Sequence, residues 1–367
     1  MTDSCESLAG ALAQQIRTRL EAAGGWLCFD EFMALALYSP GLGYYANERP
    51  KFGSMPESGS DFVTAPEISP AFGRLLAAQV AEALERTATD EVWEFGAGTG
   101  ALAEQLLGTL GDKLSRYTIV DLSGSLRARQ QERLAAFADK LHWADALPDA
   151  MQGVVVGNEV LDAMPVQLLV RKSGEWCERG VAWNEAEPGF AWADRPTSLR
   201  PPIEIEGPQD YLTEIHAQGE AFVRTLADRL TRGAAFFIDY GFGEGEYYHP
   251  QRHMGTLVCH RAHRMDDNPL VDLGLKDITA HVNFTGTAVA AQEAGMDVLG
   301  YTTQAHFLIN CGLLQQLEAM TQGQRAMAAK LMMEHEMGEL FKVIGLSRGV
   351  EPWPALGFAQ GDRTHRL

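Results

Sequence analysis

The 367-residue chain has little positive charge: 30 lysines and arginines stand against 49 aspartates and glutamates, which gives a formal net charge of −19 at pH 7. Binding to nucleic-acid phosphates needs a basic surface, so this balance argues against a nucleic-acid partner. An acidic surface attracts basic partners instead, including a protein segment that carries arginine. The composition therefore favours a protein partner over a nucleic acid.

Paired cysteines and long apolar runs are also missing. The 5 cysteines are scattered without a Cys-x-x-Cys spacing, which excludes a zinc ribbon or a disulfide scaffold and favours free thiols. No apolar run approaches the ~18 residues of a membrane-spanning helix, and the acidic first residues lack the apolar stretch of a signal peptide. The histidines between 249 and 281 are irregularly spaced, so they predict no metal site. We expect a cytoplasmic protein without a membrane span, and the sequence leaves its oligomeric state open.

The chain does contain a strand–turn–helix signal at residues 92–103, VWEFGAGTGALA. An apolar, β-prone run breaks at Gly96, Gly98 and Gly100 and resumes from Ala101 with leucines at helical spacing. Glycines at such a turn let the main chain approach a ligand, and the start of the helix directs backbone N–H groups toward it. The stretch predicts a cofactor site at the end of this strand.

Two cofactors are compatible with this turn. Gly96-x-Gly98-x-x-Ala101 fits the dinucleotide fingerprint, and Asp121 lies roughly 20 residues further on, where a ribose-binding acid is expected. Read from Glu94, the same residues give Glu-x-Gly-x-Gly-x-Gly, the pattern of S-adenosylmethionine (SAM) methyltransferases. An acid at that position suits an ammonium or hydroxyl group and would repel a pyrophosphate. Glu94 and the glycines would then hold the amino-acid end of SAM.

Alternating strand and helix patterns from residue 91 onward predict an α/β fold with a doubly wound parallel sheet. Later patterns predict an inserted antiparallel meander, a helix near 211–231, a pair of helices within 305–337 and two late strands. The predicted regions are an N-terminal helical and lid region (1–90), a SAM-binding Rossmann-like half (91–164), the inserted meander and helix (165–232), and the rest of the sheet (233–367) with a substrate-facing loop (241–284).

In open α/β sheets, ligands bind beside the carboxyl ends of the strands. Asp121 follows the second predicted strand and is expected to accept both ribose hydroxyls, and Asp145 follows the third and is expected to accept from the adenine amine. Asn158, Glu159 and Asp162 follow the fourth strand, where it opens onto the methyl group to be transferred.

Longer motifs extend this pattern over nearly the whole chain, which resembles the MidA-type SAM methyltransferases. The mitochondrial relatives in that family are complex I assembly factors that methylate an arginine on a core subunit. The resemblance rests on motifs at 61–69 (DFVTAPEIS), 94–100 (EFGAGTG), 158–165 (NEVLDAMP), 237–241 (FIDYG), 255–260 (GTLVCH) and 277–284 (DITAHVNF). The first, third and last are specific to the family, whereas many methyltransferases share the glycine turn.

The resemblance implies a Rossmann-like seven-stranded class I methyltransferase sheet with SAM as the cofactor. It implies a protein substrate, such as a respiratory complex I subunit or another arginine-bearing protein, and adds Thr64 and Asn158 to the cofactor-binding residues. Two departures stand out: the loop at 52–62 is longer than is usual in the family, and the stretch GEGE at 243–246 is unusually acidic. We expect the lid and its substrate contacts to differ accordingly.

An arginine acceptor is protonated at every workable pH, because its pKa lies above ~12. A carboxylate can hold the guanidinium bidentately and accept charge or a proton as the nitrogen attacks. Glu159, with Asp162 behind it, is the predicted catalytic residue. Three other functions remain open: a small-molecule SAM methyltransferase, a SAM-binding assembly factor without turnover, and a nicotinamide-dependent oxidoreductase.

Overall fold

The apolar run that ends at Asn158 forms β5 (Met151–Asn158), a central strand of the main sheet. The computed structural model describes residues 2–47, 63–121 and 124–367. The strand order in this sheet is β15–β16–β10–β5–β2–β3–β4, with the short β14 beside β10. The other strands are β2 (Glu91–Phe95), β3 (Arg116–Val120), β4 (Leu141–Ala144), β10 (Leu230–Phe242), β14 (Val282–Asn283), β15 (Asp297–Thr303) and β16 (Phe341–Arg348).

Five neighbouring strands of this sheet, β10, β5, β2, β3 and β4, run parallel, so their carboxyl ends meet at one edge. The late strand β16 is antiparallel to both of its neighbours, β10 and β15. The predicted mixed α/β fold with a central sheet is confirmed. Its parallel part is the part that brings the predicted site residues together.

Successive residues of β5 point into two different cores, as the period of two in a strand requires. Val154 and Val156 pack in the core that contains α4 and α5, and Val155 packs in the core that contains α7 and α9. Because both faces are covered, the strand is apolar throughout its middle. These helices are α4 (Ala71–Thr87), α5 (Ala101–Leu110), α7 (Ala217–Arg229) and α9 (Phe284–Glu293).

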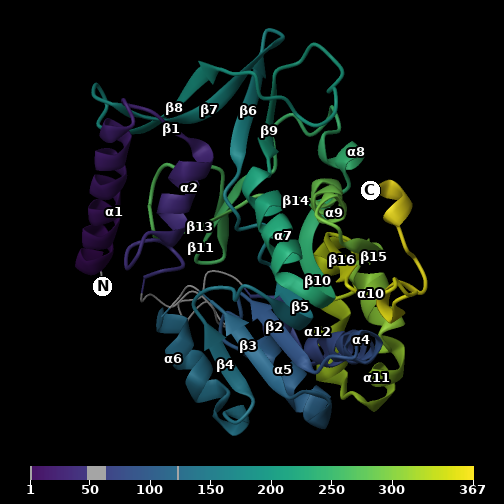
Figure 1. Ribbon diagram of the computed structural model, residues 1–367. Coiled ribbons are helices and arrows are strands. Elements are labelled where there is room, and N and C mark those ends of the chain that lie inside the picture. The colour runs from purple at the N-terminus through teal and green to yellow at the C-terminus, as the bar shows by residue number, and fades with distance from the viewer. Residues whose placement is uncertain (1, 48–62, 122–123) are drawn as a thin grey trace.

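A second, antiparallel sheet lies above the main one in Figure 1 and has the order β1–β7–β6–β9, with β8 paired to β7. Helices α1 and α2 pack against it, and their leucines and phenylalanines share one core with Val166, Leu168 and Val181. The elements are α1 (Thr2–Ala22), β1 (Leu27–Cys28), α2 (Phe29–Tyr38), β6 (Gln167–Lys172), β7 (Glu175–Asn184), β8 (Gly189–Pro196) and β9 (Tyr211–Ile215).

The helix predicted near 211–231 is wrong at its beginning. Tyr211–Ile215 is strand β9, which pairs antiparallel with β6, and the helix α7 starts only at Ala217. The apolar spacing that suggested a helix belongs to the later residues. The first five residues of the predicted helix are extended instead, because the edge of β6 offers them backbone hydrogen-bond donors and acceptors.

The segment 241–284 is not the irregular loop predicted from its composition. It contains α8 and a small three-stranded sheet with the order β12–β11–β13. Strands of two to four residues are too short to show a period, which is why the sequence pattern missed them. The elements are α8 (Glu244–Tyr247), β11 (Val258–Arg261), β12 (Arg264–Asp266) and β13 (Asp277–Thr279).

The predicted pair of helices in the tail is divided into three. Gly312, with φ of 97°, separates the first two helices, and Thr321 caps the third through a capping box with Gln324. The predicted lid loop at 52–62 lies outside the described residues. The three helices are α10 (Gln304–Asn310), α11 (Leu313–Ala319) and α12 (Gln322–Lys330). Among the helices that the structure describes, none has the length and apolar character to cross a membrane.

Candidate functional site

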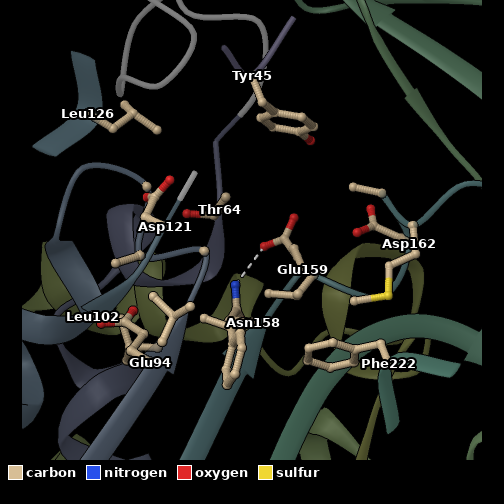
Figure 2. A pocket seen from close by; sticks show the side chains of 18 of the residues that line it. Tyr45, Thr64, Glu94, Leu102, Asp121, Leu126, Asn158, Glu159, Asp162 and Phe222 are labelled. Atoms are coloured by element: carbon tan, nitrogen blue, oxygen red, sulfur yellow. Dashed lines mark hydrogen bonds between the residues drawn. The ribbon is translucent and has the colours of Figure 1, made fainter. Parts of the chain in front are cut away.

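A cavity of about 680 Å³ lies at the carboxyl ends of β2, β3, β4 and β5 (Figure 2). This volume falls within the usual range of small-molecule and cofactor sites. The cavity brings together residues that lie far apart in the chain. Nine of the ten predicted site residues line it: Thr64, Glu94, Gly96, Gly98, Asp121, Asp145, Asn158, Glu159 and Asp162.

The glycine turn begins directly after β2 and has the backbone form that glycine permits. Gly96, Gly98 and Gly100 have φ of 63°, 53° and 83°, all in the left-handed region. Gly100, the tenth predicted residue, is not among the lining residues but precedes α5, and a Cβ there would lie 3.3 Å from Cδ1 of Leu134. Its role is therefore to let the turn pack closely against the segment after α6 (Gly124–Arg133).

Glu94 lies in β2 with only 2% of its surface exposed, and its Oε2 accepts a hydrogen bond of 2.6 Å from the hydroxyl of Tyr117. Burial raises the pKa of the Glu94 carboxyl from 4.5 to about 8, although the Tyr117 hydrogen bond lowers it in part. A cation placed beside this carboxyl would favour its ionised form. The prediction that Glu94 holds an ammonium group stays a prediction.

Gln130, a fully buried residue of α6, was not predicted from the sequence to belong to the site. Its Nε2 donates to the carbonyl of Gly98 and to Oδ2 of Asp121, each at 2.9 Å. Its Oε1 accepts from Nε1 of Trp143 on β4, also at 2.9 Å. One side chain thus connects the glycine turn, the predicted ribose acid and a third strand, and a single glutamine in a polar helix carries no sequence signal for that role.

Arg133 makes a second connection that the sequence did not predict. It forms ion pairs with Glu67 at 3.0 Å and Glu104 at 2.8 Å, and it donates to the hydroxyl of Thr99 at 2.9 Å. These contacts join α6 and α5 to α3 (Ala65–Ile68), the short helix that Thr64 precedes. The wall that carries Thr64 is thereby attached to the glycine turn.

Asp145 occupies a more exposed position than the other predicted residues. It follows β4, its side chain is 83% exposed, and it forms an ion pair with Arg127. Apolar side chains, including Leu126 and Leu147, line the cavity near it. An adenine ring would meet mainly apolar surface there, with Asp145 available at the edge.

The loop after β5 is held in an unusual conformation. Glu159 has φ of 55°, which is uncommon for a residue with a side chain and costs on the order of 1–3 kcal/mol. Oδ2 of Asp239 accepts from the backbone N–H groups of Val160, Leu161 and Asp162 at 3.1, 2.9 and 3.2 Å. Asp239 therefore holds this loop, and does not face the cavity as the other strand-end acids do.

The loop presents two carboxyl groups to the cavity, as Figure 2 shows. Glu159 accepts from Nδ2 of Asn158 at 3.0 Å, and burial together with nearby Asp162 raises its pKa from 4.5 to about 8. Asp162 accepts from the hydroxyl of Tyr240, and burial raises its pKa from 3.8 to about 6. Its Oδ1 and that of Asn158 are buried without a partner among the described residues. A ligand rich in hydrogen-bond donors would satisfy both oxygens.

The chain is similar to known methyltransferases over most of its length. Residues 75–302 match a family model described as "Putative S-adenosyl-L-methionine-dependent methyltransferase". A solved structure of a COG1565 superfamily member from Burkholderia thailandensis, bound to S-adenosyl-homocysteine, is 48% identical. The similarity covers 99% of this chain and 98% of that one, with a TM-score of 0.95. A second, native structure from that superfamily and organism is 47% identical, with a TM-score of 0.90 and the same coverage.

More distant relatives carry a named activity. The protein arginine methyltransferase NDUFAF7, mitochondrial, of Danio rerio is 26% identical over 91% of this chain and 84% of its own length. The NDUFAF7 homolog of Drosophila melanogaster is 28% identical over 98% of this chain and 91% of its own length.

Proposed function

Because this chain belongs to the MidA-type family of SAM-dependent methyltransferases, we propose that it transfers the methyl group of SAM to an arginine side chain of a protein partner. Membership of this family identifies SAM as the cofactor. The nicotinamide cofactor, which the glycine spacing also allowed, is therefore set aside. The arginine acceptor rests on relatives below 30% identity and on the chemistry of the cavity. One observation carries it: the carboxyl pair Glu159–Asp162 lies in the same cavity as the glycine turn.

The residues of the cavity fit SAM. The left-handed turn at Gly96 and Gly98 leaves room for the amino-acid end of the cofactor, and the buried Glu94 suits its ammonium group. Asp121, fixed by Gln130, would accept the ribose hydroxyls. Asp145 would accept from the adenine amine, and Thr64 and Asn158 would bind in the space between the two ends. When bound, SAM supplies a methyl group activated by a positively charged sulfur.

For the transfer, the protein has to align the acceptor nitrogen with the methyl group and remove one proton from that nitrogen. Glu159 can accept hydrogen bonds from two N–H groups of a guanidinium and align its nitrogen for in-line attack. As that nitrogen forms its bond to the methyl carbon, the bond from this carbon to sulfur would break and S-adenosyl-homocysteine would leave. The nitrogen must also lose a proton, and the Glu159 carboxylate takes it. Asp162, oriented by the hydroxyl of Tyr240, adds negative charge behind Glu159 and stabilises the cationic acceptor.

Methyl-labelled SAM incubated with lysate of the host tests this proposal. The proteins are then hydrolysed, and the labelled amino acids are identified. We expect labelled methylarginine with the wild type and a loss of at least about 100-fold with Glu159→Gln, the usual size of a lost acid–base catalyst. SAM affinity should remain within about threefold, since Glu159 is assigned to the acceptor.

The exposed Glu351 provides a matched control for the same change of charge. Glu351→Gln should label methylarginine as the wild type does. Label found on another amino acid or on a small molecule would refute the arginine acceptor. Equal labelling by wild type and Glu159→Gln would remove Glu159 from the mechanism. The predicted cytoplasmic location stays a prediction, because the curated relatives are named as mitochondrial.

A further inference from the structure

The acceptor end of the cavity contains a second tyrosine–carboxylate pair that the proposed mechanism does not use. Tyr45 donates a hydrogen bond of 2.8 Å from its hydroxyl to Oδ2 of Asp277. Asp277 is 2% exposed, lines the cavity at the start of β13, and accepts through Oδ1 from the N–H of Ile278 at 2.9 Å. The pair repeats the arrangement of Tyr240 with Asp162 on a different wall.

The charges at this end of the cavity point to a cationic ligand. Glu159, Asp162 and Asp277 all line this cavity, and the other two carboxyl groups both act to raise the pKa of Glu159. The described residues that line the cavity include no lysine or arginine. Oδ1 of Asp162, which is 5% exposed, has no hydrogen-bond partner among the described side chains. In the described part of the chain no group of three acidic, histidine or cysteine residues is arranged to hold a metal ion.

The aromatic side chains of the same wall point to the shape of that cation. The rings of Tyr38 and Tyr45 are stacked, with centroids 5.6 Å apart and an angle of 18° between their planes. The hydroxyl of Tyr38 donates to the carbonyl of Ala163 at 2.7 Å, which fixes the stack to the loop after β5. Figure 2 shows Tyr45 on the side of the cavity where Glu159 and Asp162 lie. A flat aromatic wall beside several carboxylates suits a flat cation.

We propose that Asp277, held by Tyr45, is the second carboxylate of a guanidinium-binding site and selects arginine over lysine as the methyl acceptor. This inference rests on the proposed function and specifies its substrate. A guanidinium has five N–H donors in one plane, so one edge can bind Glu159 while another binds Asp277. An ammonium is a compact group that cannot contact two separated carboxylates in this way, and it gains less from stacking on the wall of Tyr38 and Tyr45.

Binding of small acceptor analogues tests the selection without turnover. The protein is loaded with S-adenosyl-homocysteine and titrated in a calorimeter with N-acetyl-arginine amide, N-acetyl-lysine amide or N-acetyl-citrulline amide. We expect the arginine compound to bind roughly tenfold or more tightly than the lysine compound, and the neutral citrulline compound to bind more weakly than both. Equal binding of the arginine and lysine compounds, or no binding of the arginine compound at millimolar concentration, refutes the proposal.

Variants test whether the selection of arginine over lysine depends on the Tyr45–Asp277 pair. Asp277→Asn should weaken the arginine compound by roughly tenfold and Tyr45→Phe by roughly threefold, since the latter removes only one orienting hydrogen bond. Both should bind S-adenosyl-homocysteine within about twofold of the wild type, which also shows that they fold. Asp112→Asn, at a fully exposed aspartate, is the matched control and should bind every compound as the wild type does. Unchanged arginine binding in both variants overturns the proposal.

The two proposals fail in different ways. If the wild type labels methylarginine in lysate but Asp277→Asn does so with the same KM, arginine methylation stands and the selecting role of Asp277 is refuted. If the arginine compound binds in a manner that depends on Asp277 but no methylarginine forms, the guanidinium site stands and the proposed transfer reaction fails.

Discussion

The two ends of the cavity are built differently. At the cofactor end, the contacts come from consecutive strands and their turns, and the polar groups are already satisfied: Glu94 by Tyr117, and Asp121 and Gly98 by Gln130. At the acceptor end, the residues come from α2, the loop after β5, β10 and β13. That end is acidic, and a buried oxygen of Asp162 has no partner among the described residues.

This difference indicates how each end of the cavity binds its ligand. A site whose polar groups already have partners in the protein presents them to its ligand in fixed positions. A site with strained backbone at Glu159 and unsatisfied acceptors is stabilised by the ligand itself, which must be rich in donors. Variants at the cofactor end should therefore change SAM affinity, and variants at the acceptor end should change turnover.

The largest effect is expected from Gly98→Val. A β-branched residue strongly disfavours φ of 53°, and its methyl groups would fill the space proposed for the cofactor. We expect SAM affinity to fall by about 100-fold or more, measured by calorimetry. Gly174, with φ of 84° and open space where a Cβ would lie, is the control for backbone strain alone. Gly174→Val should lower stability but not SAM affinity, and an unchanged affinity in Gly98→Val contradicts the cofactor placement.

The acceptor end should give turnover a steep pH dependence. The pKa of Glu159 is raised from 4.5 to about 8, so below that value the proposed base carries its proton and cannot accept another. We expect kcat/KM, which reports the free enzyme, to rise by about tenfold per pH unit up to about pH 8 and to level off above it. The residual activity of Glu159→Gln should lack this rise. A flat profile in the wild type would exclude Glu159 as the base.

The same pKa shifts predict how the free energy of unfolding depends on pH. In the folded protein Glu159 and Glu94 keep their protons to about pH 8, whereas in the unfolded chain they lose them near 4.5. The folded state therefore binds more protons between these values, and stability falls as pH rises through this window. Glu94→Gln and Glu159→Gln should each reduce that fall in urea denaturation. If neither changes the slope, the two carboxyl groups are ionised in the fold.

A smaller effect is expected from Gln130→Met, which preserves the volume of a buried side chain but removes its three hydrogen bonds to Gly98, Asp121 and Trp143. Asp121 and the glycine turn lose their connection, so SAM affinity should fall by roughly tenfold. Gln79→Met is a matched control, because Gln79 is equally buried but hydrogen-bonds Glu82 and Gly357 outside the cavity. Both variants should be less stable, and only Gln130→Met should bind SAM more weakly. If SAM affinity falls to a similar extent in both variants, Gln130 contributes only to packing.

The smallest effect is expected from Asp145→Asn. Its side chain is largely exposed, and an amide still offers an oxygen to the adenine amine, so SAM affinity should change by no more than about threefold. Asp149→Asn, at another exposed aspartate that pairs with an arginine, should change it even less. A much larger loss in Asp145→Asn would show that the adenine end is as tightly defined as the glycine turn.

The cofactor end was largely predictable because its signals are local. The strand before Gly96, the helix that starts at Ala101 and the acids after successive strands all follow from short-range patterns, and a parallel sheet brings such strand ends to one edge. The roles of Gly100 and Gln130 were not predictable. They depend on how α6 packs against the turn, which no spacing within the sequence encodes.

The sequence by itself determined the glycine turn, the strands on either side of it along the chain and the identity of the acids at their ends, because backbone preference and hydrophobic period act over a few residues. Only the tertiary structure decided that Tyr211–Ile215 is a strand, that Asp239 holds a loop, and that Tyr45 meets Asp277. Each of these depends on a partner contributed by a distant segment. Such contacts form when the sheets and helices pack, and a local pattern contains no information about them.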